Sequence, residues 1–189
     1  WKELGCRLEL RTASAAAECF EARDVRLLLV GDSHTRKYRE ALDAAVPPER
    51  MRHKAQTAIR PACKWRNRKV RLIEGGRREE DWLEGVRAGN LASFAREVAF
   101  GPGTPATHIL FQYGHWDVRD VDEETFLGDF EDLVTALRTG GVLDGPWEII
   151  WRSAPAFSYR REDLSRDFRT NEKLASINAG ALARLPPAV

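Results

Sequence analysis

The chain has 189 residues, a length typical of one domain with one hydrophobic core. Its 30 lysines and arginines balance 29 aspartates and glutamates, and this net charge of +1 gives no bias towards nucleic acid. No apolar run approaches the roughly 20 residues that cross a bilayer, so we expect membrane contact only through a segment outside this chain. We expect a monomer with one domain over residues 1–189, in which residues 1–24 form an N-terminal lead-in.

The most continuously apolar stretch, residues 25–30, predicts a strand buried on both faces. The turn at residues 31–33, Gly-Asp-Ser, follows it directly. From residue 34 to about residue 46 the apolar side chains recur every three or four positions, which predicts a helix that ends at Pro47. This strand–turn–helix unit is the centre of the predicted fold.

The next part of the chain is less regular. Residues 49–67 are basic and lack periodicity, so we predict an elaborated loop there. The alternating pattern of residues 69–74 predicts a short strand, and residues 82–100 have the apolar spacing of a helix.

Two further apolar strands are predicted at residues 107–113 and 148–152, and two further helices at residues 123–138 and 171–185. Strands that alternate with helices indicate βαβ units and a mostly parallel sheet covered by helices on both faces. We therefore predict a three-layer α/β/α sandwich with about four strands in flavodoxin-like order and residues 25–30 at its centre.

Polar side chains follow each of the three strong strands. They are Asp32, Ser33 and His34 after the first strand, His115, Trp116 and Asp117 after the second, and Arg152 and Ser153 at the end of the third. Because the carboxyl ends of parallel strands share one edge of a sheet, we expect the three groups to converge on one crevice.

Ser33 is the candidate nucleophile of that crevice. A serine at this turn lies beside the free backbone N–H groups of a helix N-terminus, where an oxyanion can be stabilised. The alternative is that Asp32 or Ser33 only caps the helix, which either residue does well.

A base for Ser33 is not evident in the sequence. The four histidines are His34, His53, His108 and His115, and none is part of an Asp-x-x-His arrangement. Phosphate-binding loops, dinucleotide-binding glycines, HExxH and GxSxG are absent, so we expect no cofactor. We also expect no metal site, because Cys6, Cys19 and Cys63 are odd in number and lack CxxC spacing.

Two other features leave alternatives open. Cys6 and Cys19 are close enough in sequence to be bonded, but the three cysteines are equally compatible with unrelated buried thiols. The basic run at residues 60–78 has the composition of a nucleic-acid patch, but charge runs are usually solvated faces; the further alternative is a surface that holds an anionic polymer such as a uronic-acid glycan.

The wider pattern resembles one branch of the SGNH, or GDSL, esterase superfamily. The matching blocks run in the same order from Trp1 to about residue 157. They are the spaced cysteines, VRLLLVGDSHTR with Arg36 three residues after Ser33, FQYGHWD, and IIWRSAPAF. The branch holds the trichome-birefringence-like and PC-esterase proteins with the related Cas1-type and neurexophilin-like ones.

This resemblance implies an O-acetylesterase or O-acetyltransferase that acts on a glycan or another acetylated small substrate, with Ser33 as nucleophile. Gly31, Asp32, Arg36, Gly114, His115, Trp116 and Arg152 match motif positions and would form the oxyanion and substrate side. The resemblance also implies a Cys6–Cys19 disulfide and a place in the secretory pathway, in the Golgi lumen or outside the cell.

The chain departs from the superfamily pattern in two ways. The usual Gly-x-Asn-Asp block reads Gly-His-Trp-Asp here, so the N–H of His115 or Trp116 would have to replace the oxyanion-donating Asn. The catalytic Asp-x-x-His segment, expected after a fifth strand, is not within residues 1–189. We therefore expect a chain cut before its last strand, no imidazole within hydrogen-bond reach of Ser33, and an open sheet edge. The alternative function is a catalytically silent SGNH-like glycan-binding module.

Overall fold

A computed structural model describes residues 24–31, 33–45, 55–61, 69–72, 79–112, 114, 121–154 and 170–186, together with residues 18 and 22. For residues 33, 36, 43, 45, 55–61, 69–72 and 79–82 it describes the backbone only. No helix among the described residues has the length and hydrophobicity needed to cross a membrane.

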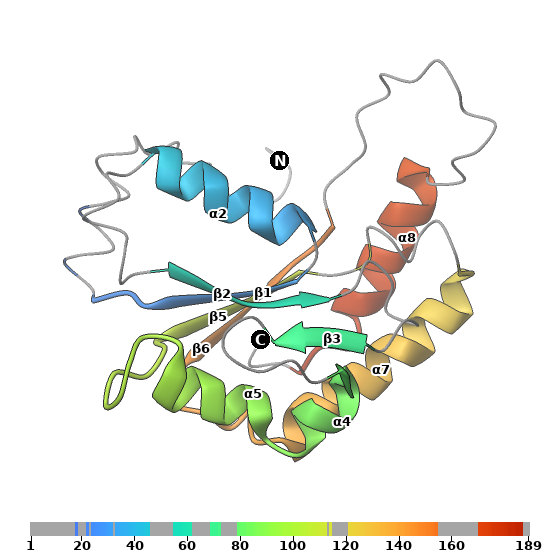
Figure 1. Cartoon of the computed structure of the whole chain (residues 1–189). Coiled ribbons are helices and arrows are strands. Elements are labelled where there is room, and N and C mark those ends of the chain that lie inside the picture. The colour runs from blue at the N-terminus through green and yellow to red at the C-terminus, as the bar shows by residue number, and fades with distance from the viewer. Residues whose placement is uncertain are drawn as a thin grey trace.

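One sheet in the order β4-β3-β2-β1-β5-β6 organises the described part of the chain (Figure 1). The strands are β1 (Leu27–Gly31), β2 (Ala55–Pro61), β3 (Lys69–Leu72), β4 (Glu79–Asp81), β5 (His108–Gln112) and β6 (Glu148–Arg152). β1 is parallel to both β2 and β5, and β5 is parallel to β6. β3 and β4 extend the sheet beyond β2 as antiparallel strands.

The predicted α/β architecture is confirmed at this level, and the strand predicted at residues 25–30 is central as expected. β1 lies between two parallel neighbours, and all five of its residues are buried. The strands predicted at residues 107–113 and 148–152 are also present, as β5 and β6. An apolar run of this kind is stable only where both faces are covered, which explains the inner position of β1.

On the side of β1 where β2, β3 and β4 lie, the predicted secondary structure was wrong. Residues 49–67, predicted as a loop, contain β2, whose sequence AQTAIRP has no apolar periodicity. The strand predicted at residues 69–74 exists as β3 but runs antiparallel to β2, and the short β4 was not predicted. These strands depend on backbone pairing with the strand beside them, which local side-chain patterns do not reveal.

The described helices are α2 (Ser33–Ala45), α4 (Trp82–Arg87), α5 (Asn90–Ser93), the π-helical turn η3 (Phe94–Val98), α7 (Glu123–Thr139) and α8 (Asn171–Leu182). Three of the four predicted helices match α2, α7 and α8 within a few residues. The helix predicted at residues 82–100 is broken instead, because Gly89 adopts a left-handed conformation with φ of 85°. The side chains of Asp122 and Thr170 cap α7 and α8 by accepting from the N–H groups of Thr125 and Lys173.

The helices lie on both faces of the sheet (Figure 1). Leu28 and Val30 of β1 pack in the larger core cluster, which includes buried side chains from α4, α5, α7 and α8. Leu27 and Leu29 point to the other face, where they form a smaller cluster beneath α2. This alternation follows from the two-residue period of a strand, and it assigns every second residue of β1 to the α2 face.

Candidate functional site

The last residues of three parallel strands stand in one row at the carboxyl edge of the sheet. Gly31 of β1 pairs with Gln112 of β5, and Gln112 pairs with Arg152 of β6. Neighbouring strands are about 4.8 Å apart, so the row spans about 10 Å from Gly31 to Arg152. The structure thus brings the backbone of Ser33, from the first predicted group of strand-end residues, and Arg152, from the third group, to one edge.

This row faces α2. Leu29 and Leu110, two positions before Gly31 and Gln112, belong to the cluster beneath that helix, and side chains two apart in a strand share a face. The guanidinium carbon of Arg152 lies 5.0 Å from the centre of the Tyr38 ring, which α2 contributes. The row is therefore covered by the first two turns of α2.

Gly31 permits the close approach of α2 to the strand ends. A Cβ atom at this position would collide with Thr35 Oγ1 and lie 2.5 Å from the Gln112 carbonyl oxygen. Ser33, two residues later, is the first residue of α2. Its backbone N–H belongs to the first turn of a helix, where N–H groups have no intrahelical acceptor and the helix dipole favours negative charge.

Arg152 is held in place by neutral groups. Its Nη1 donates a hydrogen bond of 3.0 Å to Gln112 Oε1, and its guanidinium lies over the Tyr38 ring. Arg152 is half-buried, whereas Gln112 is fully buried. Among the residues that the structure describes, no carboxylate forms an ion pair with Arg152. Its positive charge therefore has no counter-charge in the described part of the site.

Two further polar atoms lie in this region without a hydrogen-bond partner among the described residues, Thr35 Oγ1 and Gln112 Nε2. Both side chains are fully enclosed, and an unsatisfied buried polar group costs about 1–3 kcal/mol. Sequence reasoning missed both residues. A signal was present for Gln112, because it is the one polar residue that follows three apolar residues in HILFQ.

For most of the other predicted site residues the structure describes the backbone only or nothing. Ser33 and Arg36 lie on α2, but only their backbones are described. Asp32, His115 and Trp116 lie outside the described residues. Gly114 is buried with φ of 106°, and a Cβ there would lie 3.2 Å from Ile177 of α8. The structural reason for glycine at position 114 is therefore a left-handed backbone and tight packing against α8.

His108 is not the base for Ser33. It is the first residue of β5, so it lies at the opposite end of the strand from the candidate site. Its Nδ1 is 2.8 Å from Thr107 Oγ1, and its Nε2 is 3.4 Å from Glu148 Oε2. The expectation that no imidazole reaches Ser33 stays untested for the other histidines, because His53, His115 and the Ser33 side chain are not described.

The cysteines and most of the basic run at residues 60–78 also lie outside the described residues. The disulfide between Cys6 and Cys19 therefore stays a prediction. The role of the basic run as a surface for an anionic polymer also stays a prediction.

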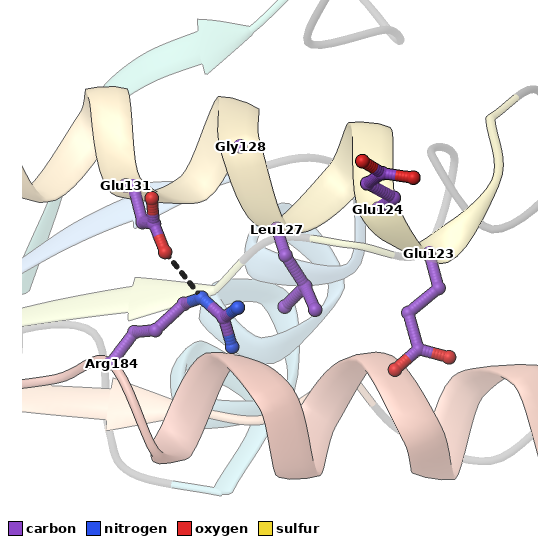
Figure 2. A pocket seen from close by; sticks show the side chains of 6 residues that line it. All are labelled: Glu123, Glu124, Leu127, Gly128, Glu131 and Arg184. Atoms are coloured by element: carbon purple, nitrogen blue, oxygen red, sulfur yellow. Dashed lines mark hydrogen bonds and ion pairs between the residues drawn. The ribbon is translucent and has the colours of Figure 1, made fainter.

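A hollow lies between α7 and the C-terminal end of α8 (Figure 2). Its lining residues are Glu123, Glu124, Leu127, Gly128, Glu131 and Arg184. Arg184 Nε donates to Glu131 across the hollow at 2.6 Å, and Ser176 donates to Glu123. These contacts join the two helices, and the described residues contain no group of His, Cys, Asp and Glu side chains that would hold a metal ion. The hollow is best explained as a helix–helix seam.

A scan against protein-family models, a search of curated proteins and a search of solved structures each found no match to this chain. Its function must therefore be inferred from its own residues and their geometry.

Proposed function

We propose that the chain catalyses acyl-ester chemistry on a carbohydrate, as an O-acetylesterase or O-acetyltransferase, with Ser33 as the nucleophile. The observation that carries this proposal is the position of Ser33. It opens a 13-residue helix directly after a buried parallel strand, at the edge where the ends of β1, β5 and β6 stand in register. Open α/β sheets bind their ligands at this edge.

The chemistry assigned to this position is nucleophilic acyl transfer. The Ser33 oxygen attacks the ester carbonyl while a base takes the hydroxyl proton, and the N–H groups at the start of α2 stabilise the oxyanion. Collapse of the tetrahedral intermediate expels the sugar oxygen, which receives that proton, and leaves an acyl-serine. Water then releases the acyl group in an esterase, whereas a second sugar hydroxyl accepts it in a transferase.

We also propose that the sheet and its helices form a flavodoxin-like, SGNH-type α/β/α sandwich. Along the sheet, the parallel strands follow the order β2-β1-β5-β6, which is the order expected of a flavodoxin-like, SGNH-type α/β/α sandwich. β6 is the last strand of the described sheet, so its outer edge is the position for the fifth strand of such a fold. The Asp-x-x-His segment that would supply the base follows that strand in the superfamily that the sequence resembles.

The direct test is Ser33→Ala in the full-length protein. Turnover of an aryl acetate and of an acetylated glycan should fall by about 10⁴-fold or more, because the variant lacks the nucleophile. Ser93→Ala is the matched control, since Ser93 is exposed at the end of α5 and far in sequence from the strand ends. Unchanged turnover in Ser33→Ala would exclude Ser33 as the nucleophile.

The second candidate is a catalytically silent glycan-binding module. It is favoured by one observation: the described side chain of His108 lies at the opposite end of β5 from Ser33. Glycan binding without any turnover in the wild-type protein would select this candidate.

The proposed setting is the secretory pathway, with Cys6 bonded to Cys19. Thiol alkylation of the secreted protein followed by peptide mass spectrometry should find both cysteines protected until a reductant is added. Free Cys6 and Cys19 thiols would contradict this part of the proposal.

A further inference from the structure

We propose that Arg152, positioned by Gln112 and Tyr38, forms an anion-binding subsite that selects sugars carrying a carboxylate or sulfate group close to the acyl ester. This inference rests on the proposed function for its substrate class, a carbohydrate. The anion site itself follows from the described contacts alone.

The first argument is the charge of Arg152. A guanidinium is always protonated, and removing part of it from water is costly unless an anion or several acceptors compensate. Here the partners are a neutral amide oxygen and an aromatic ring, and the described residues offer no carboxylate. Gln112 uses one of the five N–H donors of Arg152, and no other described residue is a hydrogen-bond acceptor for this guanidinium. The fork geometry of a guanidinium matches the two oxygens of a carboxylate or the oxygens of a sulfate.

The second argument is the arrangement of the groups around Arg152. Tyr38 covers one face of the guanidinium from α2, and Gln112 holds Nη1 from β5, so two elements restrict the orientation of the side chain. Arg152 is nevertheless only partly buried and therefore reachable. It is separated from the end of β1, which leads into Ser33, by two strand spacings of about 10 Å in all.

The third argument is the free-energy cost of burying the polar side chain of Gln112. This side chain is fully buried, its Nε2 group has no partner among the described residues, and an apolar residue of similar size would avoid the penalty. The cost is explained if the amide is kept for its Oε1, which orients Arg152 without neutralising it. A carboxylate at this position would also hold Arg152, but it would remove the charge that an anionic ligand needs.

The test measures binding in the Ser33→Ala background by calorimetry, so that it does not depend on turnover. The probes are glucuronate, glucose 6-sulfate and glucose. At least one anionic sugar should bind about tenfold or more tightly than glucose, as expected for charge-assisted hydrogen bonds. Whichever anionic sugar binds identifies the source of the charge.

Two substitutions should remove that preference. Arg152→Met removes the cation, and Gln112→Glu supplies an internal counter-charge of nearly the same shape. Arg184→Met is the matched control, because it deletes the same charge at the α7–α8 seam, and it should leave the preference intact. Circular dichroism of each variant checks that it is folded.

A measurement on unmutated Arg152 keeps the test valid if both variants fail to fold. Phenylglyoxal modifies accessible arginines, and the anionic sugar should slow modification of Arg152 but not of Arg184. Equal binding of all three sugars, or an anionic preference that survives Arg152→Met, would overturn the subsite. An Arg152-dependent preference in a protein without esterase or transferase activity would support the subsite and refute the proposed function.

Discussion

Gly31 is the residue at which the geometry of the strand edge is decided. Its missing side chain lets Thr35 of α2 and the Gln112 carbonyl of β5 approach the same Cα atom. The first turn of α2, which contains Ser33, is thereby drawn down onto the end of β1. A glycine here serves close approach, whereas Gly114 is explained by its left-handed φ.

Gly31→Ala should therefore lower the free energy of unfolding by about 1–3 kcal/mol, the cost of overpacking a tightly packed position. Urea denaturation measures the effect. Gly128→Ala is the control, since Gly128 is exposed within α7 and a Cβ there meets nothing within 4 Å. That control should gain up to about 1 kcal/mol from the better helix propensity of alanine. Equal stability of Gly31→Ala and the wild type would show that α2 can move away from β1 at no cost.

At the scale of elements, α8 is tied to the chain that leaves β6 by a reciprocal pair of hydrogen bonds. The N–H of Ala154 donates to Asn178 Oδ1, and Asn178 Nδ2 donates to the Ala154 carbonyl, both at 3.0 Å. Ala154 is buried, and among the described residues its backbone N–H and carbonyl are both satisfied by this one side chain. The pair fixes the segment that directly follows Arg152.

Asn178→Ala should lower the free energy of unfolding by about 2 kcal/mol, because it leaves two buried backbone groups of Ala154 unsatisfied. Thermal and urea denaturation report the loss. Ser176→Ala, on the same helix, removes only an exposed hydrogen bond to Glu123 and should change stability by less than about 0.5 kcal/mol. Similar values for the two variants would mean that the Asn178 pair does not hold Ala154 in solution.

At the scale of the whole molecule, the two faces of the sheet are unequally supported by the described residues. The face covered by α4, α5, α7 and α8 contains a large buried cluster, to which α7 alone contributes six buried side chains. The cluster beneath α2 consists of Leu27, Leu29 and Leu110, with three partly buried neighbours. Buried apolar area is the main source of stability, so among the described residues α2 belongs to the less extensively packed layer, and the candidate site lies beneath it.

Native-state hydrogen exchange should therefore detect earlier opening of α2 than of α7. Peptides from α2 should exchange through openings of lower free energy than peptides from α7, as followed by mass spectrometry. Saturating the site with the anionic sugar that it binds should slow exchange in α2 and leave α7 unchanged, because Tyr38 of α2 contacts Arg152. Equal protection of α2 and α7 in the free protein would contradict the inference that the α2 layer is packed less extensively than the α7 layer.

The sequence by itself determined the elements whose side chains carry a local pattern. The apolar runs predict β1, β5 and β6, and the helical spacing predicts α2, α7 and α8. The inner place of β1 also follows, because a run that is apolar on both faces must be covered on both. The convergence of the strand ends near Ser33 and Arg152 could be predicted for the same reason, since parallel strands share one carboxyl edge.

Only the tertiary structure decided the features that depend on pairing between distant segments. β2 has no apolar pattern and exists through its backbone pairing with β1, and β3 and β4 owe their antiparallel direction to their neighbours. The register that aligns Gly31, Gln112 and Arg152 is likewise a relation among three strands. Gln112 looked like the end of a strand in the sequence, and its role as the partner of Arg152 arises from a contact across 40 positions of the chain. Such a contact leaves no mark in local periodicity, because periodicity records which face a residue occupies and not which residue stands beside it.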